Sequence, residues 1–239
     1  MKYIYGPVNS RRLGLSLGLS LTPHKTCNLD CLYCQLGKTK EPASLRKEYV
    51  RIEDIFDEFK SWIQENPVDA KKLKFITISG SGEPTLNIKI GELIGRIRKI
   101  STYSIAVITN ATLLSSPEVR RSLLGVDLIV PSLDAVSQEI FAKVNRPHKD
   151  VKIDEIINGL VALRKEFSGR IWLEVMLVKG VNDDLRQIKR LKEVLEKINP
   201  DKIQLNSPVR TTAETNVLPV DKNKLLKIKK ILWENCEIV

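Results

Sequence analysis

Three of the chain's four cysteines lie within eight residues, with the spacing Cys-x3-Cys-x2-Cys. They are Cys27, Cys31 and Cys34. Thiols this close in sequence can converge from one loop, and in a reducing compartment this pattern is typical of metal or redox chemistry rather than of disulfides. Three thiolates cannot complete the four-cysteine shell of an electron-transfer cluster, so a [4Fe-4S] cluster here would leave one iron open. An open iron indicates catalysis or ligand binding.

Two other interpretations of these cysteines remain open at the level of sequence. His24 lies three residues before Cys27 and could complete a Cys3His structural zinc site. The cysteines could also be buried without a ligand. The fourth cysteine, Cys236, lies close to the end of the sequence and is expected to be structural.

Further residues that could contact a ligand lie at the ends of apolar runs of strand length or, in two cases, on such a run. Gly80 and Gly82 would let backbone carbonyls approach a ligand closely, and Glu83 can balance an ammonium group. The other candidates are Thr109, Asn110, Ser132, Asp134, Glu174 and Met176. Each of them, taken alone, is expected to be a turn former or a strand-end cap.

The runs that precede these residues predict an α/β fold. Apolar segments alternate with segments of helical period, which is the signature of a parallel sheet with crossover helices. Six such units are two short of a complete eight-fold barrel of ~250 residues, so we expect a partial (β/α)6 TIM-type barrel with parallel strands, with an open doubly wound sheet as the alternative. The candidate strands are residues 15–21, 75–79, 105–109, 128–132, 171–178 and 202–205.

Apolar stripes at helical spacing predict the crossover helices. The stripes are Ile52, Ile55, Phe56, Phe59 and Ile63; Ile90, Leu93, Ile94 and Ile97; Ile153, Ile156, Ile157 and Leu160; and Leu185, Ile188, Leu191, Leu195 and Ile198. Ser115 and Ser116 before Pro117 predict a capped helix start, and Asp183 and Asp184 are expected to cap the helix after them. A last helix is expected at about 221–233.

Composition narrows the class of protein. Hydrophobic residues make up 42% and charged residues 28% of the 239 residues, which is typical of ordinary globular domains. We expect a single domain over residues 1–239, with the core barrel at about 13–210. There is no long apolar segment and no signal-peptide pattern, so a cytoplasmic protein without membrane contact is expected. The net charge of +10 favours anionic partners such as RNA, an acidic protein or an anionic small molecule.

The cysteine spacing, with Tyr33 before the third cysteine, resembles the defining motif of the radical S-adenosylmethionine superfamily. This resemblance implies that Cys27, Cys31 and Cys34 hold a [4Fe-4S] cluster whose open iron binds S-adenosylmethionine. An electron, supplied by flavodoxin or ferredoxin, would cleave the sulfonium to a 5′-deoxyadenosyl radical that abstracts hydrogen from a substrate. The resemblance assigns cofactor contacts to Gly80, Gly82 and Glu83 (methionyl amino group), Thr109 and Asn110, Ser132 and Asp134 (ribose or carboxylate), and Glu174 and Met176 (adenosyl group).

Further segments resemble the wyosine-type tRNA-modifying iron–sulfur oxidoreductases. They are residues 5–7, 10–12, 23–26, 82–86 and 145–148. The chain is also similar to glycyl-radical-enzyme activases, which share the cysteine spacing. Wyosine-forming enzymes are expected to carry a second cluster from additional cysteines, and here only Cys236 is left over.

The sequence therefore leaves the substrate class open. Modification of a tRNA base and activation of a glycyl-radical protein are the two enzymatic hypotheses, and a zinc-stabilised nucleic-acid-binding module is the alternative of another class. A loop containing Arg146, Pro147 and His148 could contact substrate or gate the barrel. Basic residues that could form a rim for RNA are Arg11, Arg12, Lys71, Lys72, Lys74, Arg120 and Arg121.

Overall fold

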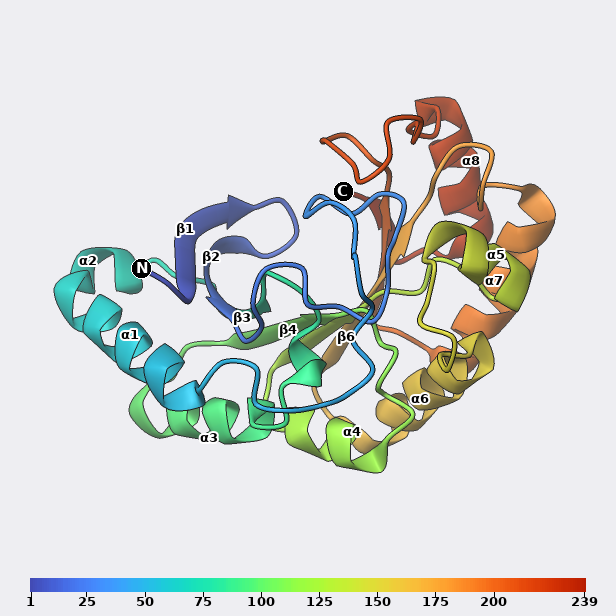
Figure 1. Ribbon diagram of the computed structural model, residues 1–239. Coiled ribbons are helices and arrows are strands. Elements are labelled where there is room, and N and C mark those ends of the chain that lie inside the picture. The colour runs from blue at the N-terminus through green and yellow to red at the C-terminus, as the bar shows by residue number, and fades with distance from the viewer.

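The computed structural model describes all 239 residues as an α/β fold. Eight strands form one sheet in the order of the sequence, and this sheet curls into an open barrel with helices on its outer side (Figure 1). Strands β2 to β8 pair in parallel, whereas β1 runs antiparallel to β2. The strands are β1 (Ile4–Ser10), β2 (Gly14–Ser20), β3 (Phe75–Ser79), β4 (Ile105–Thr109), β5 (Leu128–Pro131), β6 (Arg170–Met176), β7 (Lys202–Asn206) and β8 (Cys236–Ile238).

The six strands predicted from the sequence are present as β2 to β7, and their parallel arrangement is confirmed. Two further strands extend the partial barrel at its edges, so the predicted number of strands was too low by two. The sequence hides β1 because Gly6 and Pro7 interrupt its apolar pattern. It hides β8 because that strand is only three residues long.

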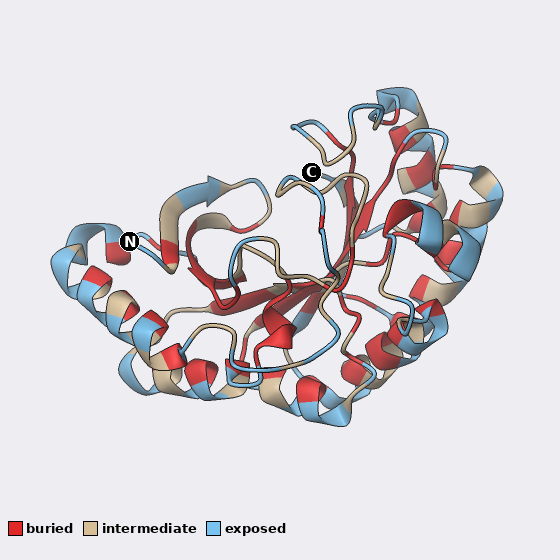
Figure 2. Ribbon diagram, in the orientation of Figure 1, coloured by how far each residue is buried: buried red, intermediate tan, exposed pale blue.

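The helices cover the outer face of the barrel and turn their buried residues toward the sheet (Figure 2). They are α1 (Ile52–Glu65), α2 (Pro67–Ala70), α3 (Ile90–Ile100), α4 (Pro117–Leu123), α5 (Gln138–Val144), α6 (Ile153–Glu166), α7 (Leu185–Ile198) and α8 (Lys222–Leu232), together with the 3-10 turn η1 (Pro84–Leu86). The four predicted stripes fall on α1, α3, α6 and α7, and the predicted last helix is α8.

Most predicted stripe residues are buried, but the edges of the stripes are not. Phe56, Ile63, Ile157 and Leu185 are only partly buried. Pro117 opens α4 as expected, but no serine side chain caps this helix. Of the two predicted caps before α7, Asp184 accepts a hydrogen bond from the backbone N–H of Arg186, at 2.8 Å. Asp183 instead accepts one from Gly180 and forms an ion pair with Lys224.

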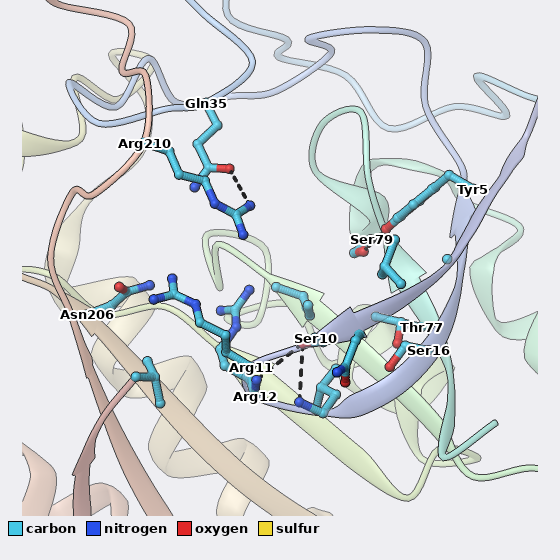
Figure 3. A pocket seen from close by; sticks show the side chains of 16 residues that line it. Tyr5, Ser10, Arg11, Arg12, Ser16, Gln35, Thr77, Ser79, Asn206 and Arg210 are labelled. Carbon is cyan, nitrogen blue, oxygen red and sulfur yellow. Dashed lines mark hydrogen bonds between the residues drawn. The ribbon is translucent and has the colours of Figure 1, made fainter. Parts of the chain in front are cut away.

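The strands bury their two faces in different surroundings. Residues that point outward join the helices in a core of 51 buried residues running from Ile4 to Cys236. A separate cluster of five residues, Leu13, Phe75, Ala106, Leu128 and Val130, lies inside the barrel. Along β3, whose alternate residues face the interior, Phe75 is followed by Thr77 and Ser79, which line a cavity (Figure 3). The barrel interior is therefore apolar at one end and polar toward the carboxyl ends of the strands.

The packing of α6 against the segment before α4 yields a testable prediction. A Cβ atom on Gly159 would lie 2.5 Å from both the carbonyl carbon of Leu114 and the backbone nitrogen of Ser115, whereas one on Gly95 of α3 would meet nothing within 4 Å. We expect Gly159→Ala to lower the free energy of unfolding by about 2–3 kcal/mol. Gly95→Ala should raise it by about 0.5–1 kcal/mol, because alanine favours helix. Urea denaturation measures both, and shifts of the same sign would contradict this packing.

Candidate functional site

The cysteines lie in the long segment between β2 and α1, which crosses the carboxyl ends of the strands. One side of this segment is joined to the loop after β3 by a bridge between Thr26 and Gly82. The backbone N–H of Glu83 donates to the carbonyl oxygen of Thr26, at 2.9 Å. A Cβ atom on Gly82 would lie 1.9 Å from that same oxygen. Gly82 is therefore required for the close approach of the cysteine segment, a role that the sequence analysis did not foresee.

The other side of the cysteine segment is held by the loop after α5. The backbone N–H of His148 donates to the carbonyl oxygen of Asn28, at 2.9 Å. The Arg146 guanidinium lies 3.6 Å from Asp30 and 2.6 Å from Glu214, so it joins this segment to the loop before α8. The loop that the sequence suggested as a gate thus contacts the cysteine segment directly and braces it.

Amide groups from neighbouring loops donate to two of the thiols. Cys27 Sγ accepts hydrogen bonds from Asn110 Nδ2 and from the backbone N–H of Leu29, both at 3.4 Å. Cys31 Sγ accepts one from Asn145 Nδ2, at 3.3 Å. Burial raises the pKa of Cys27 to about 11 and also raises the pKa of Cys31, while these N–H donors oppose the shift. The donors favour the thiolate, which is the form that binds metal.

The third thiol has a cationic partner. Lys25 Nζ lies 2.9 Å from Cys34 Sγ, and all three cysteines are free. No three His, Cys, Asp or Glu side chains converge as ligands of one metal ion, so the Cys3His zinc site with His24 is not formed. Thiolates that bind different irons of a cluster need no such convergence. The three sulfurs thus each accept from an N–H donor, while the geometry offers no fourth protein ligand beside them.

Glu83 connects the ends of β3 and β4 as a buried hydrogen-bond acceptor. Its Oε1 atom accepts from the backbone N–H of Thr85 at 3.0 Å, from the Thr85 hydroxyl at 2.6 Å and from the Thr109 hydroxyl at 2.7 Å. Its Oε2 atom accepts from the backbone N–H of Asn110, at 2.7 Å. Burial raises the pKa of Glu83, against these hydrogen bonds. Both oxygens are thus engaged with the protein, and Glu83 holds the backbone of Asn110 in place.

Asp134 plays a comparable part at the ends of β5 and β6. Its Oδ1 atom accepts from the backbone N–H of Met176 and its Oδ2 atom from Asn145 Nδ2, at 2.8 and 2.7 Å. The hydroxyl of Tyr33 also donates to Oδ2. Burial raises the pKa of Asp134 to about 6. The sequence analysis did not include Tyr33 among the site residues. Its position between Cys31 and Cys34 could have indicated that it lies at the site.

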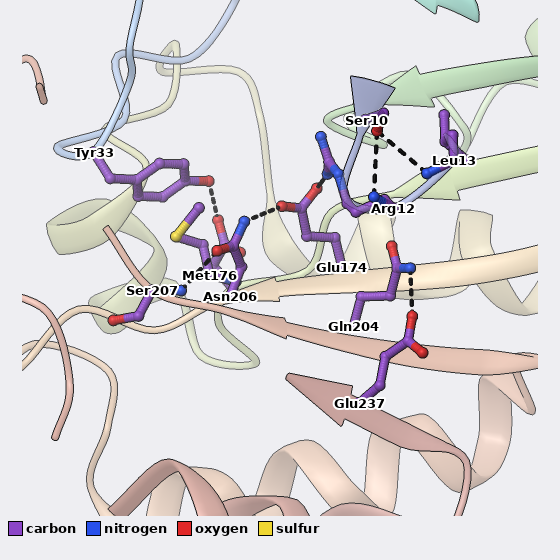
Figure 4. Close-up of polar contacts among 11 residues, drawn as sticks. Ser10, Arg12, Leu13, Tyr33, Glu174, Met176, Gln204, Asn206, Ser207 and Glu237 are labelled. Atoms are coloured by element: carbon purple, nitrogen blue, oxygen red, sulfur yellow. Dashed lines mark hydrogen bonds and ion pairs between the residues drawn. The ribbon is translucent and has the colours of Figure 1, made fainter. Parts of the chain in front are cut away.

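Glu174 on β6 forms a polar contact across the barrel interior. It pairs with Arg12 from the turn between β1 and β2, and it accepts a hydrogen bond from Asn206 of β7 at 3.1 Å (Figure 4). The partners of Glu174 lie 162 and 32 residues away in the sequence. The buried carboxylate thereby fixes the direction of Arg12, which sequence analysis placed only in a general basic rim.

The candidate residues fall into three groups. A cavity of about 620 Å³ is lined by Gly80, Glu174 and Met176 together with Cys34. A second, much smaller cavity of about 30 Å³ is lined by Asn110, Ser132 and Asp134. Tyr33 lines both cavities. The remaining three residues, Gly82, Glu83 and Thr109, form contacts between the cysteine segment, the loop after β3 and the end of β4.

The seven basic residues suggested as a rim do not form one. Lys71, Lys72 and Lys74 precede β3 and so belong to the end of the barrel opposite the cysteines. Arg120 is buried on α4, where it pairs with Glu166. Of the seven residues, only Arg11 and Arg12 line the interior cavity shown in Figure 3. The linear sequence could not distinguish the two ends of the barrel for residues in loops.

Comparison with known proteins identifies the class to which this fold and site belong. Residues 21–191 match the family model described as the Radical SAM superfamily, and the chain belongs to this enzyme family. Members of the family use S-adenosylmethionine and a [4Fe-4S] cluster. The resemblance stated from the cysteine motif is therefore confirmed, and the alternative of a zinc-stabilised binding module is not supported. No helix has both the length and the apolar character needed to span a membrane.

Among curated relatives, a UPF0026 protein of Methanocaldococcus jannaschii is 35% identical over 234 residues, which are 98% of this chain and 72% of the relative. A protein named GTPase Obg of Brachyspira hyodysenteriae is 38% identical over 237 residues, or 99% of this chain, but the chain spans only 34% of that protein. A probable dual-specificity RNA methyltransferase RlmN of a Thermotoga species is 27% identical over 87% of this chain and 59% of its own.

Solved structures share the fold at lower identity. A radical SAM methyltransferase from Sphaerobacter thermophilus superposes with a TM-score of 0.73 at 17% identity, over 94% of this chain and 65% of that one. Archaeal TYW1 gives 0.58 at 22% identity, over 92% and 72%. A domain of pyruvate-formate lyase-activating enzyme from Bacteroides vulgatus gives 0.55 at 20% identity, over 69% and 98%. The predicted partial barrel is thus the fold of these enzymes.

The hydrogen bonds of Glu83 lead to a prediction about stability. In Glu83→Gln the side-chain NH2 group would face N–H and O–H donors, so we expect the free energy of unfolding to fall by about 2–3 kcal/mol. The control is Glu118→Gln, which removes an exposed ion pair with Arg46 and should cost less than about 0.5 kcal/mol. Urea denaturation of the reduced apoprotein measures both. An equally small effect of the two substitutions would argue against Glu83 as the link between β3 and β4.

Proposed function

We propose that this protein cleaves S-adenosylmethionine reductively at a [4Fe-4S] cluster held by Cys27, Cys31 and Cys34, and that the resulting radical acts on a base of tRNA. The observation that carries the proposal is the setting of the three thiols: each accepts a hydrogen bond from an N–H donor of the chain. In addition, Cys34 lines the cavity at the carboxyl ends of the strands.

The residues around the cysteines suit a cluster with one open iron. When bound, such a cluster supplies the electron that splits the sulfonium of S-adenosylmethionine into methionine and a 5′-deoxyadenosyl radical. The amides of Asn110 and Asn145 and the ammonium of Lys25 would stabilise negative charge on the sulfurs, which is one way in which proteins adjust the potential of a cluster. An external flavodoxin or ferredoxin would deliver the electron.

We assign direct contacts with S-adenosylmethionine to residues that line the two cavities beside the cysteine segment. In the larger cavity these are Gly80, Glu174 and Met176, and in the smaller one Asn110 and Ser132. Asp134 lines the smaller cavity too, and because both of its oxygens accept from the protein it would act by holding Tyr33 and Asn145. Gly82, Glu83 and Thr109 would act indirectly, by holding the cysteine segment and the end of β4 in place. Because Tyr33 lines both cavities and donates to Asp134, its ring would set the boundary between the two groups of contacts.

Two observations favour RNA as the substrate. The net charge of +10 attracts polyanions. Among the proteins similar to this chain, one is named as an RNA methyltransferase and one as TYW1. The activation of a glycyl-radical protein is the second candidate, because a domain of pyruvate-formate lyase-activating enzyme shares the fold.

The cluster assignment predicts the metal content of cysteine variants. Protein purified without oxygen and reconstituted should contain about four irons and four sulfides per chain. Cys27→Ala, Cys31→Ala and Cys34→Ala should each lose the stable cluster, because three thiolates are the only protein ligands. Iron and sulfide analysis measures this, and the electron paramagnetic resonance spectrum of the reduced protein should change when S-adenosylmethionine is added.

Cys236→Ala is the matched control, since this buried thiol lies on β8 in the helix-facing core. It should retain the full iron content and the response to S-adenosylmethionine. Retention of the iron after replacement of any cysteine of the motif would refute the assignment, as would zinc at one per chain without iron.

The substrate class can be tested in cells. Deletion of the gene should remove one modified nucleoside from tRNA hydrolysates analysed by mass spectrometry, and the wild-type gene should restore it. An unchanged nucleoside profile, together with loss of a glycyl-radical signal in a partner enzyme, would instead favour the activase hypothesis.

A further inference from the structure

The interior of the barrel contains a third cavity, which the proposed chemistry does not use. It has a volume of about 390 Å³ and extends from the turn after β1 to the segment after β7 (Figure 3). Of its 16 lining residues, three are arginines, none is Asp or Glu, and one is Val239, the last residue of the sequence. A cavity of this size and polarity suits a small anionic group.

Two of the three arginines have no acidic partner. Arg12 pairs with Glu174, but Arg11 and Arg210 form no ion pair. The Arg210 guanidinium donates only to the neutral amide oxygen of Gln35, at 3.3 Å. In Figure 3, Arg11 and Arg210 approach the cavity from different sides. Neither guanidinium is paired with an Asp or Glu side chain, and guanidinium groups match the oxygens of phosphate in geometry.

A buried hydroxyl in the same cavity lacks a partner. Thr77 on β3 is only 4% exposed, and its Oγ1 atom has no hydrogen-bond partner. An unsatisfied buried hydroxyl costs about 1–3 kcal/mol unless a ligand or water completes it. Thr77 Oγ1 is one of six buried side-chain atoms without a partner, and of these six residues Thr77 alone lines this cavity. Thr77 lies in the wall that carries Ser79, opposite the arginines (Figure 3).

This cavity is adjacent to the one beside the cysteines. Tyr5, Arg12, Gln35, Ser79, Ile108 and Asn206 line both. A group bound between Arg11, Arg210 and Thr77 would therefore hold the rest of its molecule next to Cys34. The arrangement suits a substrate that is anchored by a charged group and presents a neutral part to the radical.

We infer that this cavity binds a phosphate group of the substrate, with Arg11 and Arg210 as charged partners and the Thr77 hydroxyl as a further donor. The inference rests on the proposed function, because it takes the anchored molecule to be the substrate, and it narrows the substrate to a phosphate-bearing molecule such as a nucleotide unit of RNA. Phosphate is favoured over carboxylate because its oxygens are arranged tetrahedrally, so that guanidinium groups approaching from two sides and a hydroxyl from a third can all donate to it.

Calorimetric titration of the reconstituted, oxygen-free protein tests the inference. The probes are uridine 5′-monophosphate, uridine and succinate, since uridine lacks the adenine of S-adenosylmethionine. We expect the monophosphate to bind at least tenfold more tightly than uridine or succinate. Arg210→Gln should weaken the binding of the monophosphate about tenfold, because a charge-assisted hydrogen bond is lost, and should leave that of uridine unchanged.

Two further variants separate a built site from general attraction by positive charge. Thr77→Val is nearly isosteric, and it should weaken the binding of the monophosphate about threefold while raising the urea midpoint of the free protein, because it removes an unsatisfied hydroxyl. Arg190→Gln, an exposed position on α7 without an ion pair, is the matched control and should bind like the wild type.

The outcomes distinguish this inference from the proposed function. If S-adenosylmethionine alters the spectrum of the cluster but uridine and its monophosphate bind alike, the phosphate site is refuted and the proposed function stands. If the monophosphate binds and Arg210→Gln weakens it while the spectrum does not respond, the phosphate site stands without that function. Tighter binding of succinate, or an equal loss in Arg190→Gln, would also overturn the phosphate site.

Discussion

The close backbone contact between Thr26 and Gly82 determines where the cysteines lie. It brings the segment that follows β2 against the loop after β3, and only glycine leaves room for the carbonyl of Thr26. The buried carboxylate of Glu83 then ties this loop to the end of β4, where the Asn110 amide reaches Cys27. The position of the first thiol therefore depends on a chain of short-range contacts among three loops, rather than on the cysteine segment alone.

The position of the second thiol, Cys31, also depends on contacts from other loops. Asn145 donates both to Cys31 and to Asp134, and Asp134 accepts from the backbone of Met176. One amide thus links the second thiol to the end of β6. Buried polar groups are costly without partners, so the hydrogen bonds of the Asn145 Nδ2 group favour one arrangement of the loops over others. A radical enzyme benefits from such rigidity, because reactive species must meet only the intended substrate.

The barrel interior has an apolar packed region at one end and polar cavities toward the other. The apolar cluster around Phe75 and Leu128 closes one end of the interior, while the residues nearer the carboxyl ends are polar and line two adjoining cavities. Because side chains alternate along a strand, β3 contributes to both regions: Phe75 lies in the apolar cluster, and Thr77 and Ser79 line the cavity. Membership of the radical SAM superfamily is in keeping with this division, since the strand ends and their loops carry the chemistry in barrel enzymes.

Local patterns in the sequence by themselves determined the order of the six central strands, the faces of the main helices and the class of chemistry. Periodicity and cysteine spacing involve residues close in the chain, so they can be interpreted without a structure. Only the tertiary structure decided that Gly82 serves loop packing, that Glu83 faces protein donors and that the basic residues do not form one rim. These outcomes depend on contacts between distant segments, such as those between Arg12 and Glu174 or between Tyr33 and Asp134, which lie 162 and 101 residues apart. The partner of a side chain is set by the curvature of the whole sheet, and no local pattern encodes it.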